Sequence, residues 1–186
     1  MRTVAVFTVL VLGSGACVAE RERTPDASVS REENEAALLE VDYQAFDQTS
    51  GGGWRELSDR GEYVEAAELI DAYLEASDDL DAGQRVNLTF HAGQAYAFAD
   101  STELALHRFR AALVDTEPAG SPVRWNAYVR ATIAFLENDR SMLTAMREEI
   151  AAGPDIQGVI PNLDIVDQLL AGLSGSYAEA YQPDAS

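Results

Sequence analysis

The sequence predicts an all-α fold, a short solenoid of stacked helical hairpins with about eight helices, after an N-terminal signal peptide and a flexible tether. Apolar residues recur at three- and four-residue steps through most of residues 35–182. Outside the leader no run of alternating polarity indicates a strand, and glycine, proline and capping residues divide the helical runs. With 47% apolar and 24% charged residues among 186, the chain can bury the core of one domain.

Residues 1–19 are typical of a signal peptide. Arg2 precedes the apolar run TVAVFTVLVL, which is too short for a stable membrane span of about 20 residues. Two processing routes stay open. Ser14-Gly15-Ala16-Cys17 resembles a bacterial lipobox, which favours lipidation of Cys17, whereas ordinary cleavage after Ala19 would discard that cysteine. We therefore expect export to the periplasm or cell envelope, with a lipid anchor at Cys17, for example in the outer membrane.

Two segments precede the predicted repeats. Residues 20–34 are charged, contain Pro25 and lack aromatic residues, which predicts a flexible acidic tether. Residues 35–53 predict a short helix over Glu35–Gln48, followed by a linker in which three consecutive glycines, 51–53, oppose helix formation.

Helix–turn–helix patterns fill residues 54–154. The segment Asp81–Ala99 is apolar nearly all round, which indicates a helix between two neighbours. Residues 155–186 predict a C-terminal helical pair and a tail. The other predicted helices cover Trp54–Asp59, Glu62–Ser77, Ser101–Val114, Ser121–Leu136, Asp139–Ile150, Asn162–Leu173 and Ser176–Gln182.

Five residues in the middle of the chain carry a repeat signature. Gly93, Tyr96, Ala105, Phe109 and Ala112 follow one another at steps of 3, 9, 4 and 3 residues. Small residues let two helices approach, and an aromatic ring fills the space beside them. This pattern resembles the tetratricopeptide repeat. The resemblance implies stacked helical hairpins with a concave face that binds other proteins.

The flanking units match the signature less well. They lie 39 residues before and 36 residues after the central unit, compared with about 34 in the family, and a generic helical bundle stays the alternative. The same steps fall on Trp54, Leu57, Ala66, Ile70 and Tyr73 in the first unit, and on Val129, Thr132, Ser141, Ala145 and Glu148 in the third.

Other stretches resemble a small group of exported bacterial proteins without a known activity. They are Trp125 to Tyr128, Phe135 to Arg140, Asn162-Leu163, Val166-Asp167 and Tyr177 to Tyr181. This resemblance implies no reaction or ligand.

Charge and composition exclude several functions. All 13 basic residues are arginines and face 32 acidic residues, for a net charge of −19. This acidity argues against nucleic-acid binding and against a basic membrane-docking face, so we expect membrane contact only through lipid at Cys17. A single cysteine excludes an intrachain disulfide and a cysteine-based zinc site.

No residue pattern predicts catalysis, a cofactor or a small-molecule substrate. The chain has no phosphate-binding glycine loop followed by lysine and no Gly-x-Ser-x-Gly elbow. His91 and His107 fall on the two helices of the central unit, where Asp100 and Glu103 are near in sequence. We favour two separate histidines over a metal site, because zinc prefers three or four ligands with supporting contacts.

The sequence therefore predicts a non-enzymatic scaffold or adaptor of the cell envelope that binds an unknown protein partner. Arg130 is a candidate residue of the concave groove, although such arginines more often pair with nearby acids. A self-associating structural or assembly subunit is the alternative function. A metal-dependent enzyme that uses carboxylate ligands is the least favoured one.

Overall fold

The computed structural model describes residues 27–181. The predicted signal peptide (1–19), Cys17 and the first part of the tether lie outside the described residues, as do residues 182–186. Within 27–181, no helix has the length and apolar character needed to cross a bilayer.

Residues 27–181 form ten helices and no strand, so the predicted all-α fold is confirmed. One of them, η1, is a π-helix. The helices are α1 (Ala27–Leu38), η1 (Gln44–Gln48), α2 (Arg55–Asp59), α3 (Tyr63–Ala76), α4 (Ala82–Phe98), α5 (Thr102–Ala111), α6 (Trp125–Leu136), α7 (Arg140–Ala151), α8 (Leu163–Ala171) and α9 (Tyr177–Ala180).

The predicted tether is too long at its C-terminal end. Helix α1 begins at Ala27, so residues 27–34 are helical. Arg31 helps to explain this difference, because it pairs with Glu35 one turn later at 2.8 Å. Arg31 also lies 3.9 Å from carboxylate oxygens of Glu62 and Glu65 beside α1.

The single helix predicted over Glu35–Gln48 is also wrong. Helix α1 ends at Leu38, and η1 begins only at Gln44. Asp42 starts the second segment, since its side chain accepts a hydrogen bond from the backbone N–H of Ala45 at 2.8 Å. Such local bonds of aspartate compete with continued helix formation.

Three helical hairpins, α2–α3, α4–α5 and α6–α7, share one kind of turn. In each turn a residue with positive φ follows the first helix, and the next backbone N–H bonds to a carbonyl oxygen five residues earlier. This geometry satisfies the last carbonyls of the first helix. The positive-φ residues are Gly61, Asp100 and Asn138, and the bonds join Glu62 to Leu57, Ser101 to Tyr96 and Asp139 to Ala134.

The hairpin α4–α5 is closely packed at its centre. A Cβ added to Gly93 would lie 2.9 Å from two atoms of the Phe109 ring, closer than side chains normally approach. Phe109, Ala105 and Ala112 are completely buried, and Tyr96 is nearly so. A glycine at position 93 therefore lets α4 approach the aromatic ring of α5.

The shared turns correct the register predicted for the third unit. They are 39 residues apart between the first and second hairpins, as predicted, but 38 rather than 36 between the second and third. Ser141, Ala145 and Glu148 consequently lie on the exposed side of α7, whereas Leu143 and Ile150 are buried. Ser141 and Ala145 are small, as the repeat signature requires at such positions, and this similarity led to the wrong register.

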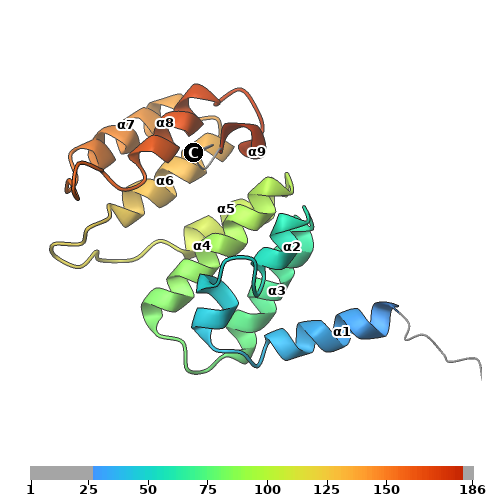
Figure 1. Cartoon of the computed structure of the whole chain (residues 1–186). Coiled ribbons are helices and arrows are strands. Elements are labelled where there is room, and N and C mark those ends of the chain that lie inside the picture. The colour runs from blue at the N-terminus through green and yellow to red at the C-terminus, as the bar shows by residue number, and fades with distance from the viewer. Residues whose placement is uncertain (1–26, 182–186) are drawn as a thin grey trace, which may run out of the picture.

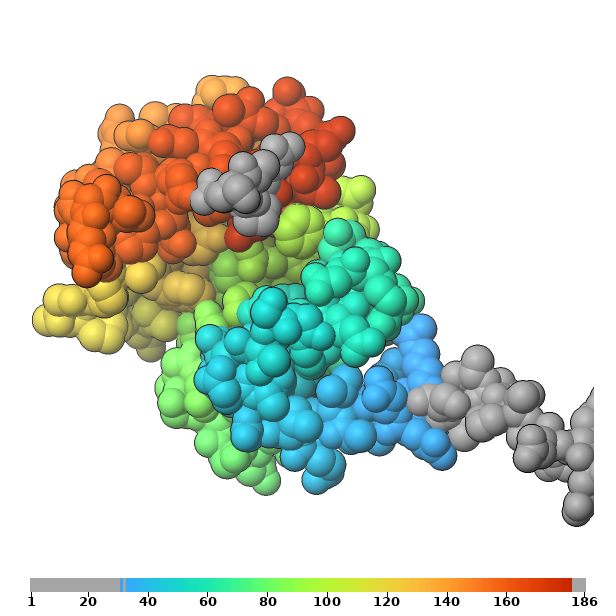
Figure 2. Space-filling view, viewed as in Figure 1, coloured from blue at the N-terminus to red at the C-terminus, as the bar shows by residue number. Residues whose placement is uncertain are grey.

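The hairpins lie next to one another in chain order, with α3 against α4, α5 against α6 and α7 against α8. Figure 1 shows α6 to α9 as one group beside α2 to α5, with α1 projecting from the second group. The short helix α9 returns to contact α4. In the space-filling view of Figure 2, the red C-terminal region and the cyan first hairpin lie on either side of the green α4–α5 region.

Candidate functional site

Asp47 is the most unusual polar residue of the described chain. It lies on η1, and its side chain is 0% exposed. Burial of a carboxylate is unfavourable unless donors and positive charges surround it. A π-helical turn widens the helix locally, and such turns are frequent at functional sites.

A glycine turn brings the first donor to Asp47. Gly53 has a φ of +55°, and a Cβ there would lie 1.9 Å from the carbonyl oxygen of Phe46, so only glycine fits. The turn places Trp54 back over η1, where its Nε1 donates to Asp47 Oδ1 at 2.9 Å. The glycine run that the sequence predicts to be a linker therefore forms a tight turn, which brings Trp54 into contact with η1.

Helix α4 supplies two further donors one turn apart. Nδ1 of His91 lies 2.7 Å from Asp47 Oδ1, and Nδ2 of Asn87 lies 3.3 Å from Asp47 Oδ2. Because an ionised carboxylate only accepts hydrogen bonds, His91 Nδ1 is the donor in this contact. Asn87 also donates to the hydroxyl of Tyr43 at 3.0 Å. These bonds fasten η1 to the central helix.

Arg55 completes the surroundings of Asp47. Its Nε donates to the main-chain oxygen of Asp47 at 2.8 Å, and its guanidinium carbon lies 4.2 Å from the centre of the Trp54 ring. Another guanidinium nitrogen of Arg55 is 3.7 Å from Asp47 Oδ1. The side chain is thus held by a carbonyl oxygen, a carboxylate and an aromatic face.

The electrostatic balance keeps Asp47 ionised. Burial acts to raise the pKa of Asp47, but the hydrogen bond and charge of His91, the Trp54 N–H and the charge of Arg55 outweigh it. The pKa of Asp47 consequently falls well below its ordinary value. The negative charge is therefore a permanent part of the folded structure at neutral pH.

A second acidic group links α3, α4 and α5. Asp71 Oδ2 accepts hydrogen bonds from the Tyr96 hydroxyl at 3.2 Å and from Arg108 at 2.6 Å. Burial, followed by the charge of Asp71, raises the pKa of Tyr96 to about 12. The other oxygen, Asp71 Oδ1, is buried without a hydrogen-bond partner among the described residues. This group connects the first two hairpins.

A cleft of about 580 Å³ opens beside Trp54 and Arg55. The first hairpin, α4 and α9 form its walls, which carry the aromatic side chains of Trp54, Tyr63, Phe98 and Tyr181. The rings of Tyr63 and Phe98 are 5.3 Å apart, and those of Phe98 and Tyr181 are 5.4 Å apart. We call this space the aromatic cleft. Asp47 does not line the cleft itself, but it contacts Trp54 and Arg55 and so fixes the position of these two lining residues.

Comparisons with known proteins give no further guide to the chemistry of this region. No protein-family model matches the chain, and no curated protein and no solved structure matches it. The geometry of the described residues therefore has to carry the functional argument.

The described residues do not assemble a metal centre. Across residues 27–181, no group of three or more His, Cys, Asp or Glu side chains could hold a metal ion. His91 is engaged with Asp47, whereas His107 is exposed on α5. The arrangement around Asp47 is suited to positioning Trp54 and Arg55, because the Trp54 Nε1 donates to its carboxylate and the Arg55 Nε donates to its main-chain oxygen.

The sequence-predicted site residues lie in two kinds of environment. Gly93, Tyr96, Ala105, Phe109 and Ala112 are buried between α4 and α5. Arg130 is exposed on α6 and does not line the aromatic cleft, so its groove role stays a prediction. Cys17 lies outside the described residues.

Sequence reasoning missed Asp47, Trp54 and Arg55. A signal was present, because Asp47 falls one residue after the apolar stripe ends at Phe46 and shortly before the three glycines. The separation of 44 positions between Asp47 and His91 meant that no local pattern showed the pairing.

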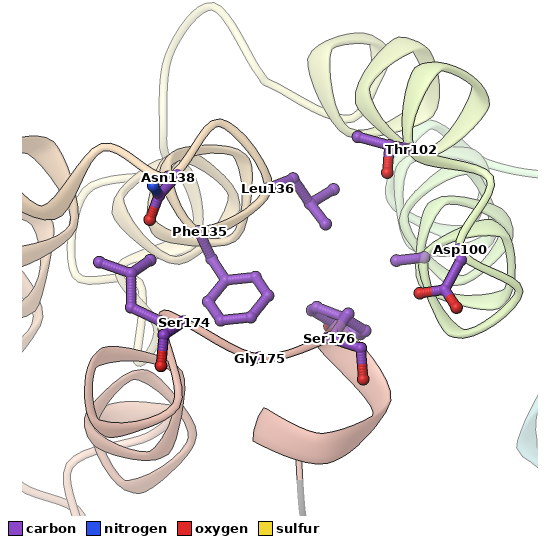
Figure 3. Close-up of a pocket in the computed structure, with 11 residues that line it drawn as sticks. Asp100, Thr102, Phe135, Leu136, Asn138, Ser174, Gly175 and Ser176 are labelled. Carbon is purple, nitrogen blue, oxygen red and sulfur yellow. The ribbon is translucent and has the colours of Figure 1, made fainter.

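A second cavity of about 440 Å³ lies between two hairpin turns and the loop before α9. In Figure 3 the ring of Phe135 points into it, with Asp100 and Thr102 on one side and Asn138 and Ser174 on the other. Asp100 is its one charged lining residue. Two rings in contact, Phe135 and Tyr177, line this cavity, but it lacks the opposite charges and the larger group of aromatic rings found in the aromatic cleft.

Proposed function

We propose that this chain is a non-enzymatic interaction module of the cell envelope, with hairpins stacked in a manner similar to tetratricopeptide repeats. It binds a partner protein through the aromatic cleft and is held at the membrane by lipid on Cys17. The observation that carries the proposal is the cleft lined by Trp54, Tyr63, Phe98, Tyr181 and Arg55. Tryptophan, tyrosine and arginine are the residues that contribute most binding energy in protein interfaces.

The way in which Arg55 is held supports this proposal. Its contacts with Asp47 and Trp54 fix the side chain before any partner arrives. A preorganised side chain loses less conformational entropy on binding than a mobile one. The half-buried rings of Tyr63 and Phe98 are likewise fixed by stacking on each other.

Site-specific photo-crosslinking in cells that produce the full chain tests the proposal. A benzoylphenylalanine at Ser58, which lines the cleft, should give an adduct with a different protein. The same probe at Leu104, which is 52% exposed on α5, should not give this adduct. Absence of an adduct at position 58, or the same adduct at both positions, would contradict the proposal. An adduct with a second copy of the chain would instead support self-association.

A further inference from the structure

The aromatic cleft contains one carboxylate without a counter-charge. Of its two charged lining residues, Arg55 is turned toward Asp47, with which it makes a main-chain hydrogen bond and a 3.7 Å charge contact. Asp59 has no hydrogen bond or ion pair with any residue in the described range 27–181. The neighbouring Arg60 is engaged elsewhere, at 2.8 Å from both Glu56 and Glu62.

The carboxylate of Asp59 lies at the exposed rim of the cleft. It is exposed at the end of α2, and its Oδ2 lies 4.0 Å from the point where Gly51 would carry a Cβ. Gly51 is itself a lining residue. A side chain entering the cleft could therefore reach the carboxylate across a residue that offers no steric hindrance.

The walls of the cleft suit the same kind of ligand. Aromatic faces attract ammonium and guanidinium groups, more strongly when the contact is shielded from water. Tyr63, Phe98 and Tyr181 form a continuous series of rings, and none of them is fully exposed. The apolar stem of a long basic side chain can lie along such rings while its charged head stays near a carboxylate.

The long-range field also favours a basic ligand. The chain carries 32 acidic residues and 13 arginines, for a net charge of −19. A field of this sign raises the association rate of positively charged partners and repels acidic ones.

We infer that the aromatic cleft receives an arginine or lysine side chain from a segment of the partner protein, with its charged head at Asp59 and its stem against the aromatic rings. This inference rests on the proposed function and names the chemistry of the segment that binds. Arg55 does not compete for Asp59, because its guanidinium is held by the main-chain oxygen of Asp47 and the Trp54 ring and makes no ion pair with Asp59.

Titration of the purified chain with two short peptides tests the inference. The probes are acetyl-Gly-Arg-Gly-amide and the same peptide with citrulline, which keeps the shape of arginine but has no charge. Binding is followed by nuclear magnetic resonance. We expect the arginine peptide to bind at least about tenfold more tightly than the citrulline peptide, and to weaken as salt is added.

Two variants separate the local carboxylate from the overall field. Asp59→Asn should weaken binding of the arginine peptide by about fivefold or more. Asp115→Asn changes the net charge equally at an exposed position that lines no part of the cleft, and it should have little effect. Both positions are exposed, so neither variant should disturb folding.

Three results would overturn the inference: no binding of the arginine peptide, equal binding of the citrulline peptide, or equal weakening by both variants. If one of these is found while position 58 gives an adduct, the inference fails and the proposed function stands. If the arginine peptide binds as expected but position 58 gives no adduct, the cleft recognises a basic side chain and the proposed function fails.

Discussion

Two regions of the described chain, η1 to α5 and α6 to α9, are stabilised by different kinds of interaction. From η1 to α5, buried or half-buried charges connect the helices, with Asp47 bound to His91 and Asp71 bound to Arg108. From α6 to α9, the described residues include no buried charged side chain, and aromatic rings lie at the centre of the packing. The fully buried Tyr177 contacts Phe98, Phe135 and Tyr181 at ring distances of 5.1 to 5.8 Å. Removal of one polar group should therefore be costly in the first region and tolerable in the second.

The cleft lies where these two regions meet. Trp54 and Arg55 are positioned by the charge network, whereas Tyr181 belongs to the aromatic group. A change on either side could therefore alter the cleft without touching a residue that lines it. Asp47 is the clearest case, because it lines no cavity described above and contacts two cleft residues.

The largest expected effect comes from Asp47→Ala. The substitution leaves the donors of Trp54, Asn87 and His91 without their acceptor inside the protein. Loss of one partner of a buried charge pair lowers the free energy of unfolding by about 3–5 kcal/mol. Chemical denaturation of the purified protein measures this change.

The exposed pair of Arg147 and Asp167 supplies the matched control. Asp167→Ala removes a carboxylate that lies 2.7 Å from Arg147 at the surface. Exposed ion pairs contribute about 0–1 kcal/mol. If Asp47→Ala and Asp167→Ala lowered the free energy of unfolding equally, burial would not increase the contribution of the Asp47 network to stability.

The contribution of the Asp47 charge should disappear in acid. Because the pKa of Asp47 is depressed in the folded protein, its charge adds stability above the unfolded-state pKa of 3.8, and that stability is lost as pH falls further. The difference in unfolding free energy between the wild type and Asp47→Asn should thus be constant from pH 7 to pH 5 and shrink below about pH 4. Urea denaturation at each pH gives the difference. A constant difference down to pH 2.5 would contradict the charge argument.

The next effect is steric and concerns the packing of α4 on α5. Gly93→Ala places a methyl group against the Phe109 ring, and such overpacking costs about 1–3 kcal/mol. Adding Phe109→Leu should recover part of this loss, because the smaller side chain makes room. Thermal unfolding of both single variants and the double variant measures the coupling. Strictly additive losses would mean that the two residues do not press on each other.

These expectations show which parts of the molecule were predictable. The helices follow from apolar periodicity, and the contact between Gly93 and Phe109 joins two residues that the repeat signature had already singled out. Local patterns suffice there because the contacting residues are only 16 positions apart. The split of the helix predicted over Glu35–Gln48 combines a local signal that was overlooked, the Asp42 side chain that accepts from the N–H of Ala45, with a tertiary contact that no local pattern shows, the Tyr73 hydroxyl that donates to the carbonyl oxygen of Val41.

The site was less predictable than the fold for the same physical reason. Asp47 reads as one more surface acid in a chain with 32 acidic residues, and apolar periodicity carries no information about which acid is buried. Its partners lie on a different helix, so only the tertiary structure brings them together. The third repeat was misplaced by two residues because the small residues that fit the signature, Ser141 and Ala145, lie on the exposed face of α7, whereas its buried face carries Leu143 and Ile150.

The smallest expected effect tests the aromatic region directly. Tyr177→Phe removes a hydroxyl that accepts a hydrogen bond from Gln94 at 3.3 Å and keeps the ring. Gln94 is only half-buried and can bond to water instead, so the loss should be about 0.5–1.5 kcal/mol. If Tyr177→Phe proved as damaging as Asp47→Ala in the same denaturation experiment, the second region would depend on polar bonds as strongly as the first. The cleft would then lie between two regions that both depend on polar interactions, and the difference proposed between η1 to α5 and α6 to α9 would be wrong.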